Sequence, residues 1–330
     1  ITCIYLYFGG YVSTAINSVI QGLIMTFGVI YMVFRVVSLS GGLADGIAGL
    51  AAISTDKLPA GTFTSVLGPS PLDLVTLLLM TSLGTMGLPQ MISKFNGIRD
   101  RKAVKRATIM STVFALIIGG GAYFMGGFAR ILNAKLSISF DAANLDTLMP
   151  AIFQVILSPE MMAVLVILML SASMSTLAAV VLVSAPTFSK TILKKDSMLP
   201  MRLLSLLFVL ISYLVAVIPS AIVTLMSFSW GAVSGSFIGP YLWGLYDRKL
   251  TRSGAAAGMV SGLGTVVIGG AIVLLTKSPT GLWAPRLAVL ALIVSLLVTP
   301  LVSRLAGSRA VLPEGAKYLD KAQDGAAGKA

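Results

Sequence analysis

The chain has 330 residues, of which 56% are hydrophobic and only 11% charged; its net charge is +12 and its mean hydropathy is +0.94. Soluble domains carry about a quarter of their residues as charged side chains, so this composition indicates an integral membrane protein. The absence of histidine and the single cysteine, Cys3, exclude histidine-based nucleophilic catalysis, an internal disulfide and a thiolate metal cluster.

Eight apolar stretches are long enough to cross a bilayer. A hydrocarbon core about 30 Å thick needs about 20 apolar residues, and continuous rather than alternating apolar runs favour helices over strands. The stretches are residues 12–34, 72–92, 107–129, 161–184, 201–219, 221–245, 254–276 and 285–304. The segment "ITCIYLYFGG" before the first resembles the end of one more helix, broken at Gly9 and Gly10. Without an initial Met or a signal peptide, the chain is expected to begin within a longer protein.

Two of the segments outside the spans differ from short loops. The connection after the first span runs for roughly 35 residues, and its mixed composition predicts short helical or irregular cover rather than a separate domain. The last segment, residues 306–330, is rich in Gly, Ala and Lys and lacks an apolar face, so we expect a disordered tail.

Basic residues predict the orientation of the chain. Of the 24 Lys and Arg residues, 18 lie around residues 94–106, 190–202 and 248–252 and in the tail from residue 304, whereas the alternate connections hold six. Because Lys and Arg in short loops are retained in the cytoplasm, we expect a multi-pass protein of the plasma (inner) membrane with a cytoplasmic C-terminus. This topology accounts for the charge of +12 without a nucleic-acid partner.

The span cores contain no Asp or Glu, and the chain has no Gly-rich loop after a strand that could cradle phosphates. Proton relays through membranes usually need carboxylates inside the bundle, so a proton pump is disfavoured. ATP-driven transport has no support either. With no histidine as well, an enzyme is not expected.

The second span is interrupted by helix-breaking residues. Its sequence "TSLGTMGLPQ" contains Gly84, Gly87 and Pro89, and proline costs about 3 kcal/mol inside a helix and frees a carbonyl. One interpretation is a kink packed against neighbouring helices. The other is a discontinuous helix whose unpaired backbone groups face a solute cavity, as in secondary transporters.

A cluster of hydroxyl side chains lies in the fourth span, in "SASMSTLAAVVLVSAPTFSK". On a helix, the carbonyl of Ala172 lies beside the hydroxyls of Ser175 and Thr176, so three neutral oxygens can meet there. Hard cations prefer such oxygens, and a singly charged ion can be held without a carboxylate. The alternative is a packing face of small residues whose hydroxyls bond back to their own helix.

Four stretches in order resemble the solute:sodium symporter family, in particular its sodium/proline carriers. They are "YLYFGGYVSTAINSVIQGLIM", "LGTMGLPQMISKFNGIRDRKAVKRA", "SASMSTLAAVVLVSAPTFSKTIL" and "FIGPYLWGLYDRKLTRSGAAAGMVSG". The resemblance implies an all-α, leucine-transporter-type fold of two inverted five-helix repeats. Residues 1–305 would hold the end of core helix four, core helices five to ten and two peripheral helices. The first three core helices, missing here, would be partners from the same polypeptide.

The resemblance also implies binding residues. Ala172, through its carbonyl, and Ser175 and Thr176, through their hydroxyls, match the sodium ligands of core helix eight, which backbone carbonyls of core helix one would complete. The positions that line the solute cavity fall on Thr81, Thr85 and Pro89, where the family's proline carriers have aromatic residues. Trp230 and Ser234 could face the same cavity or serve packing.

One position departs from the family pattern. Asn17 and Ser18 stand where the family commonly has Thr-Asp, so a carboxylate associated with a second cation route is absent and one sodium per cycle is the hypothesis.

The expected function is import of a small solute (an amino acid, a carboxylate or a sugar) coupled to a sodium ion, with the lipid bilayer as its environment and no organic cofactor. A transporter-like sensor module and a sodium-independent facilitator of the same fold remain alternatives.

Overall fold

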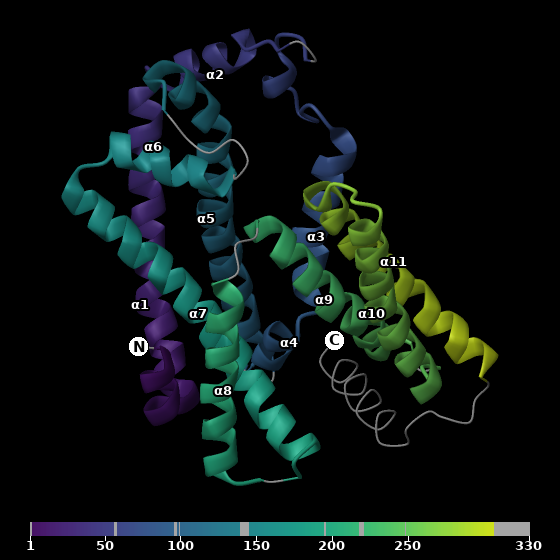
Figure 1. The fold of residues 1–330 in the computed structure, drawn as a ribbon. Coiled ribbons are helices and arrows are strands. Elements are labelled where there is room, and N and C mark those ends of the chain that lie inside the picture. The colour runs from purple at the N-terminus through teal and green to yellow at the C-terminus, as the bar shows by residue number, and fades with distance from the viewer. Residues whose placement is uncertain are drawn as a thin grey trace. The chain divides into compact units, whose positions relative to one another are not determined.

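A computed structural model of the chain describes residues 2–55, 58–95, 98, 100–138, 145–194, 196–217, 221–247 and 249–306; for residues 2–14 only the backbone is described. Within these ranges the regular structure is helical (Figure 1), apart from an isolated bridge between Thr55 and Leu58. The prediction of an all-α protein is confirmed.

Seven helices among the described residues are long and apolar enough to cross a membrane. They are α1 (Thr2–Leu39), α5 (Arg101–Leu136), α7 (Pro159–Thr191), α8 (Met198–Ala216), α9 (Ile222–Tyr246), α10 (Arg252–Leu275) and α11 (Thr280–Leu305). Each overlaps one of the predicted spans over most of its length, so the chain is a multi-pass membrane protein. The remaining predicted span, residues 72–92, is divided into α3 (Pro71–Met86) and α4 (Pro89–Phe95).

The break expected at Gly9 and Gly10 is not observed, and that prediction is wrong. Helix α1 continues through both glycines and has 38 residues, about 57 Å at 1.5 Å per residue. A glycine inside a helix costs about 1 kcal/mol but keeps its backbone hydrogen bonds, so two glycines alone do not end a helix.

The long connection after α1 is short helical and irregular cover, as predicted. It contains α2 (Leu43–Ala52) and the single 3₁₀ turn η1 (Thr62–Thr64). A second connection, between α5 and α7, contains η2 (Leu145–Thr147) and α6 (Leu148–Ile156). The prediction of a disordered tail falls on residues 307–330, outside the described residues.

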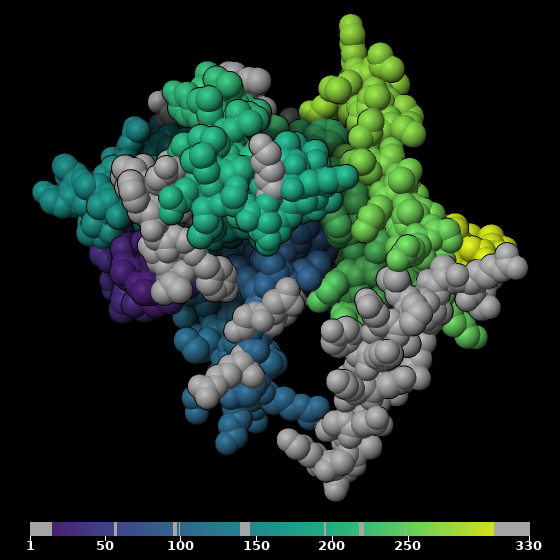
Figure 2. Space-filling model, turned by 90° about the horizontal axis from the view of Figure 1, so that it is seen from below, coloured from purple at the N-terminus to yellow at the C-terminus, as the bar shows by residue number. Residues whose placement is uncertain are grey.

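The chain forms two compact units. Unit 1 comprises residues 1–69 and 96–219, and unit 2 comprises residues 70–95 and 220–330. In unit 1, an apolar core joins α1, α5, α6 and α7 around Val36, Leu132 and Ile152. The C-terminal end of α7 and the N-terminal end of α8, in teal and green, face the viewer in Figure 2. Phe188 and Phe208 meet edge to face, 6.0 Å between ring centres, between these two helices.

Two cationic side chains cap helix ends in unit 1. Lys135 Nζ donates to the Ser40 carbonyl just past the end of α1 (2.8 Å), and Arg35 Nη2 donates to the Ile156 carbonyl at the end of α6 (2.9 Å). The last carbonyls of a helix lack partners within it, and cations there also interact favourably with the helix dipole.

Unit 2 is built on close packing of α9, α10 and α11, which lie side by side (Figure 1). A Cβ at Gly231 would come within 2.8 Å of the Ala288 Cα, and one at Gly262 would overlap the Gly235 carbonyl oxygen. Small residues therefore let these backbones approach one another, as is usual for membrane helices. Trp243 Nε1 also donates to the Leu296 carbonyl at 2.8 Å.

Candidate ion and solute sites

The hydroxyl cluster lies in the middle of α7, a 33-residue helix that continues through Pro186. Ser175 Oγ donates to the Ala172 carbonyl at 2.9 Å, and Thr176 Oγ1 donates to the same oxygen at 3.2 Å. The three oxygens named from the sequence thus lie close together, and both hydroxyls bond back to their own helix, which is also the arrangement that the packing alternative predicts. Since each hydroxyl hydrogen points at the carbonyl, the hydroxyl lone pairs remain available to a cation.

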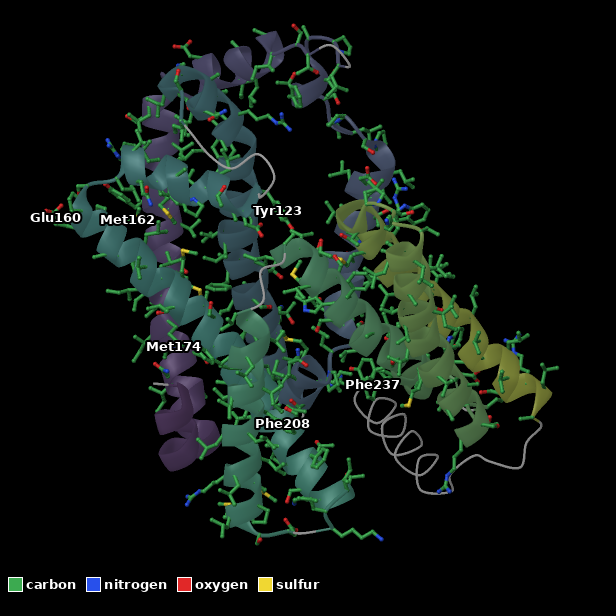
Figure 3. The ribbon with its side chains drawn as sticks, in the orientation of Figure 1. Tyr123, Glu160, Met162, Met174, Phe208 and Phe237 are labelled. Atoms are coloured by element: carbon green, nitrogen blue, oxygen red, sulfur yellow. The ribbon has the colours of Figure 1, made fainter. Side chains whose placement is uncertain are left out.

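The surroundings of this cluster change along the helix. Ser171 is buried and Ser175 is half-buried, whereas Ser173 and Thr176 are exposed. Figure 3 labels Met174, the residue before Ser175, on α7. Three oxygens on one helix are half of what a hard cation such as Ca²⁺ or Mg²⁺ takes, about six or more, so a site here needs ligands from elsewhere.

The second span is a discontinuous helix. Helix α3 ends at Met86. The next two residues, Gly87 and Leu88, stand outside regular structure, and α4 begins at Pro89. Proline suits the first position of a helix because its missing N–H would have no partner there. Of the two interpretations of "TSLGTMGLPQ", the structure shows the interruption rather than a kink in a continuous helix.

Trp230 and Ser234 of α9 lie against the last two turns of α3. The Gly84 Cβ position would be 3.8 Å from the Trp230 ring, and Gly87 contacts Ser234 directly. Ser234 is fully buried, and its Oγ has no hydrogen-bond partner. The structure therefore brings the candidate residues of α9 to the broken end of α3.

The threonine hydroxyls of α3 donate hydrogen bonds to backbone carbonyls of their own helix. Thr81 Oγ1 donates to the Leu77 carbonyl at 2.8 Å, and Thr85 Oγ1 donates to the Ser82 carbonyl at 2.8 Å. Both side chains are half-buried, and their oxygens can still accept hydrogen bonds. The predicted solute-binding residues all lie in unit 2, and the predicted sodium ligands all lie in unit 1.

Sequence reasoning missed an ion pair that joins α3 to α11. Arg286 Nη2 lies 2.7 Å from Asp73 Oδ1, and Ser70 Oγ donates to Asp73 Oδ2 at 2.6 Å. The guanidinium also lies 5.4 Å from the centre of the Trp283 ring. The signal was present, because Asp73 and Arg286 are rare charges near the same ends of two apolar spans.

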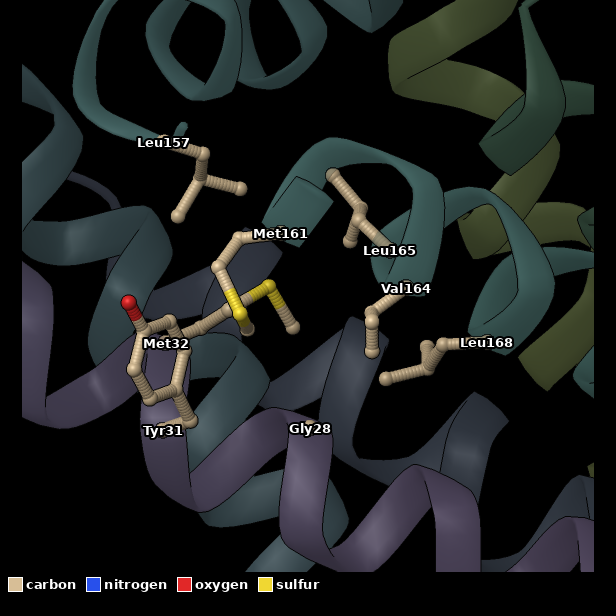
Figure 4. Close-up of a pocket in the computed structure, with 8 residues that line it drawn as sticks. All are labelled: Gly28, Tyr31, Met32, Leu157, Met161, Val164, Leu165 and Leu168. Carbon is tan, nitrogen blue, oxygen red and sulfur yellow. The ribbon is translucent and has the colours of Figure 1, made fainter. Parts of the chain in front are cut away.

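Two cavities of unit 1 are lined by residues other than the predicted ligands. One of about 10 Å³ lies between α1 and α7 and is lined by apolar side chains and Tyr31 (Figure 4). A larger apolar groove of about 520 Å³ runs along α1 and α5. Across the described part of the chain, no group of three or more Cys, Asp or Glu side chains could hold a metal ion.

The profile of the sodium:solute symporter family matches residues 1–262. The chain is 25% identical over 280 residues to a sodium/pantothenate symporter of Haemophilus influenzae, covering 80% of this chain and 55% of that protein. It is 27% identical over 281 residues to the high-affinity proline transporter of Bacillus subtilis, covering 80% and 56%.

A further relative is sodium/proline symporter 2 of Staphylococcus saprophyticus, 25% identical over 284 residues, with 81% of this chain and 53% of that protein covered. The chain thus spans about half the length of the curated relatives it matches. No solved structure matches significantly. The match over most of the chain shows that it belongs to the sodium:solute symporter family, a family of transporters rather than enzymes.

Proposed function

We propose that this chain is part of a sodium-coupled secondary transporter that imports a small organic solute by alternating access. The observation that carries the proposal is the convergence of Ser175 and Thr176 on the Ala172 carbonyl, in a chain that belongs to a sodium symporter family. The carbonyl and the two hydroxyls would form half of the sodium site, and other core helices would supply the rest.

Coupling requires that sodium and solute each bind one conformation more tightly than the other, because equal affinities shift no equilibrium. In our proposal, sodium ties α7 to its partner helix and so favours the outward-open state that accepts solute. The solute then makes contacts that favour closure. One sodium per cycle is proposed, since Asn17 and Ser18 provide no carboxylate for a second route.

The solute site is proposed at the broken end of α3. Thr81, Thr85 and Pro89 would line it from α3 and α4, and Trp230 and Ser234 from α9. These groups are neutral hydrogen-bond donors and acceptors beside one aromatic surface, which suits an amino acid, a carboxylate or a sugar. Named relatives carry proline or pantothenate, both small and polar.

The membrane and the orientation of the chain in it are also part of the proposal. We propose the plasma (inner) membrane, with the C-terminus in the cytoplasm because the basic connections alternate with less basic ones. Neither an organic cofactor nor a nucleic acid has a role in this cycle.

The double variant Ser175→Ala, Thr176→Ala tests the ion site. In the full-length protein, half-maximal solute uptake should require at least tenfold more sodium, because two of the three oxygens on α7 are lost. The matched control is Ser184→Ala, Thr187→Ala, which removes two hydroxyls that bond back to the same helix outside the site. Unchanged sodium dependence in the first variant would contradict the assignment.

Replacement of sodium by choline separates the alternatives. Loss of uptake supports sodium coupling. Uptake that persists at the same rate indicates a facilitator, and saturable solute binding without net uptake indicates a sensor module.

A further inference from the structure

Four cationic side chains occupy the first two turns of α5. All four are exposed, and within the described part of the chain they form no ion pair or hydrogen bond. We call them the basic face; they are Arg101, Lys102, Lys105 and Arg106. The neighbouring acid, Asp100, caps the helix, and its Oδ1 accepts a hydrogen bond from the Ala103 N–H at 2.7 Å.

The basic face lies at the end of α5 where cations are least favoured. The N-terminus of a helix carries the positive end of its dipole, and the first turn of α5 contains no acid. Other cations of unit 1 have partners. Lys135 and Arg35 each donate to a carbonyl at the end of a helix, and Lys190 lies 2.9 Å from a carboxylate oxygen of Asp196. An anion from outside the chain would give the basic face the compensation that these cations have.

The basic face points away from α1. A Cβ at Gly22 of α1 would lie 3.6 Å from the Phe114 ring, so the side of α5 that holds Phe114 meets α1. Lys105 precedes Phe114 by nine residues, which are two and a half turns, and therefore lies on the opposite side of the helix.

The basic face also lies at the depth of lipid headgroups. Residues 107–129 of α5 contain no charged side chain and rise by about 35 Å, which suits a hydrocarbon core about 30 Å thick. From Arg101 to Arg106 the helix rises by about 7.5 Å, close to the thickness of one headgroup layer. The four cations thus lie just outside the hydrocarbon core, at the level of the phosphates.

We propose that the basic face binds anionic phospholipids. Their phosphate groups contact its four cations, and their acyl chains lie along apolar side chains in the next turns on the same side of α5. These side chains, each more than half exposed, are Ile109, Val113 and Leu116. Clusters of Lys and Arg beside a membrane span are typical of segments that bind anionic lipids. Retention of basic loops in the cytoplasm, by contrast, requires no particular side of a helix.

The test measures contact between α5 and lipids of known charge. In a background without other cysteines, Thr112→Cys of the full-length protein carries a fluorophore; residue 112 is exposed, two turns deeper than Lys105 and on the same side. The protein is reconstituted into vesicles of phosphatidylcholine and phosphatidylglycerol, with brominated acyl chains, which quench on contact, on one lipid or the other. The relative affinity should favour phosphatidylglycerol at least about fivefold, the factor expected for one cation at an anionic surface.

The neutral variant Lys102→Gln, Lys105→Gln, Arg106→Gln should abolish this preference. The matched control removes the same charge from the C-terminal segment and should retain the preference; it is Lys317→Gln, Lys321→Gln, Lys329→Gln.

A second variant exchanges neighbouring residues, Lys102→Ala with Ala103→Lys and Lys105→Val with Val104→Lys. It keeps the charge at this membrane boundary, and with it the signal for orientation, but moves two cations away from the basic face. The preference should therefore fall. If the neutral variant does not insert correctly, the exchange variant decides alone.

A preference that the correctly inserted variants retain would overturn the proposal. Weak quenching by both lipids would also overturn it, because it would mean that protein covers this side of α5. The inference goes beyond the proposed function and depends on α5 crossing the membrane. Since the measurement needs neither sodium nor solute, its failure would leave the proposed transport unaffected, and sodium-independent uptake would leave this surface unaffected.

Discussion

Gly87 decides how closely α3 approaches α9. A Cβ at this position would overlap Ser234 Oγ and lie 2.7 Å from the Ser234 carbonyl oxygen and 3.0 Å from its Cα. Two of these three atoms belong to the backbone and cannot rotate away. The contact leaves Ser234 of α9 buried, with an unpaired hydroxyl, beside the interruption between α3 and α4.

We therefore predict that Gly87→Ala destabilises the protein by about 1–3 kcal/mol, the usual cost of overpacking, and impairs uptake. Thermal unfolding of the detergent-purified protein measures the first effect. Gly264→Ala is the control, because Gly264 of α10 has nothing within 4 Å of its Cβ position. Equal melting temperatures for the two variants would show that the close contact is unimportant.

At the scale of elements, the ion pair between Asp73 and Arg286 fastens the first turn of α3 to α11. The guanidinium reaches Asp73 through both Nε (3.2 Å) and Nη2 (2.7 Å), and the two side chains are only 32% and 26% exposed. Helix α3 is thus held at one end by an ion pair and interrupted at the other by Gly87 and Leu88. Any change in direction between α3 and α4 would occur at that interruption.

A double-mutant cycle with Asp73→Asn and Arg286→Gln measures this attachment. We expect a favourable coupling energy at the upper end of the range for accessible pairs, because the pair is partly shielded from water. The pair between Lys190 and Asp196, at 2.9 Å but 54% and 74% exposed, serves for comparison and should couple by less than about 0.5 kcal/mol. If the effects of Asp73→Asn and Arg286→Gln on stability are purely additive, the ion pair does not help to hold α3 against α11.

On the scale of the whole molecule, charge and hydropathy organise the chain. The connections rich in Lys and Arg alternate with connections that hold few, and seven described helices are long enough to cross the membrane between them. Each helix end near a basic connection should therefore lie in the cytoplasm.

Cysteine labelling tests this orientation in a Cys3→Ser background. Lys102→Cys, Lys194→Cys and Lys249→Cys should react with a membrane-impermeant maleimide only in inside-out vesicles, and Lys277→Cys only in right-side-out vesicles. Lys249 and Lys277 flank α10 alone. Labelling of both from one side would mean that α10 does not cross the membrane.

The element pattern followed from local properties of the sequence. Uninterrupted apolar runs predicted all seven long helices, and Gly87 with Pro89 marked the second span as either kinked or broken, because hydropathy and helix breakers act over a few neighbouring residues. The same local reasoning misjudged Gly9 and Gly10, through which α1 continues. There the cost of two glycines was too small to end an otherwise favourable helix.

In the candidate sites, too, the sequence predicted contacts within one helix but not contacts between helices. The spacing of Ala172, Ser175 and Thr176 was enough to predict their convergence, since the helix itself sets that geometry. By contrast, the ion pair of Asp73 with Arg286 and the contact of Gly87 with Ser234 join residues that lie far apart in the sequence. One sequence alone determined the membrane class, the helices and the proximity of polar groups that share a helix. Only the tertiary structure decided which helix faces meet, because that depends on packing between side chains far apart in the chain.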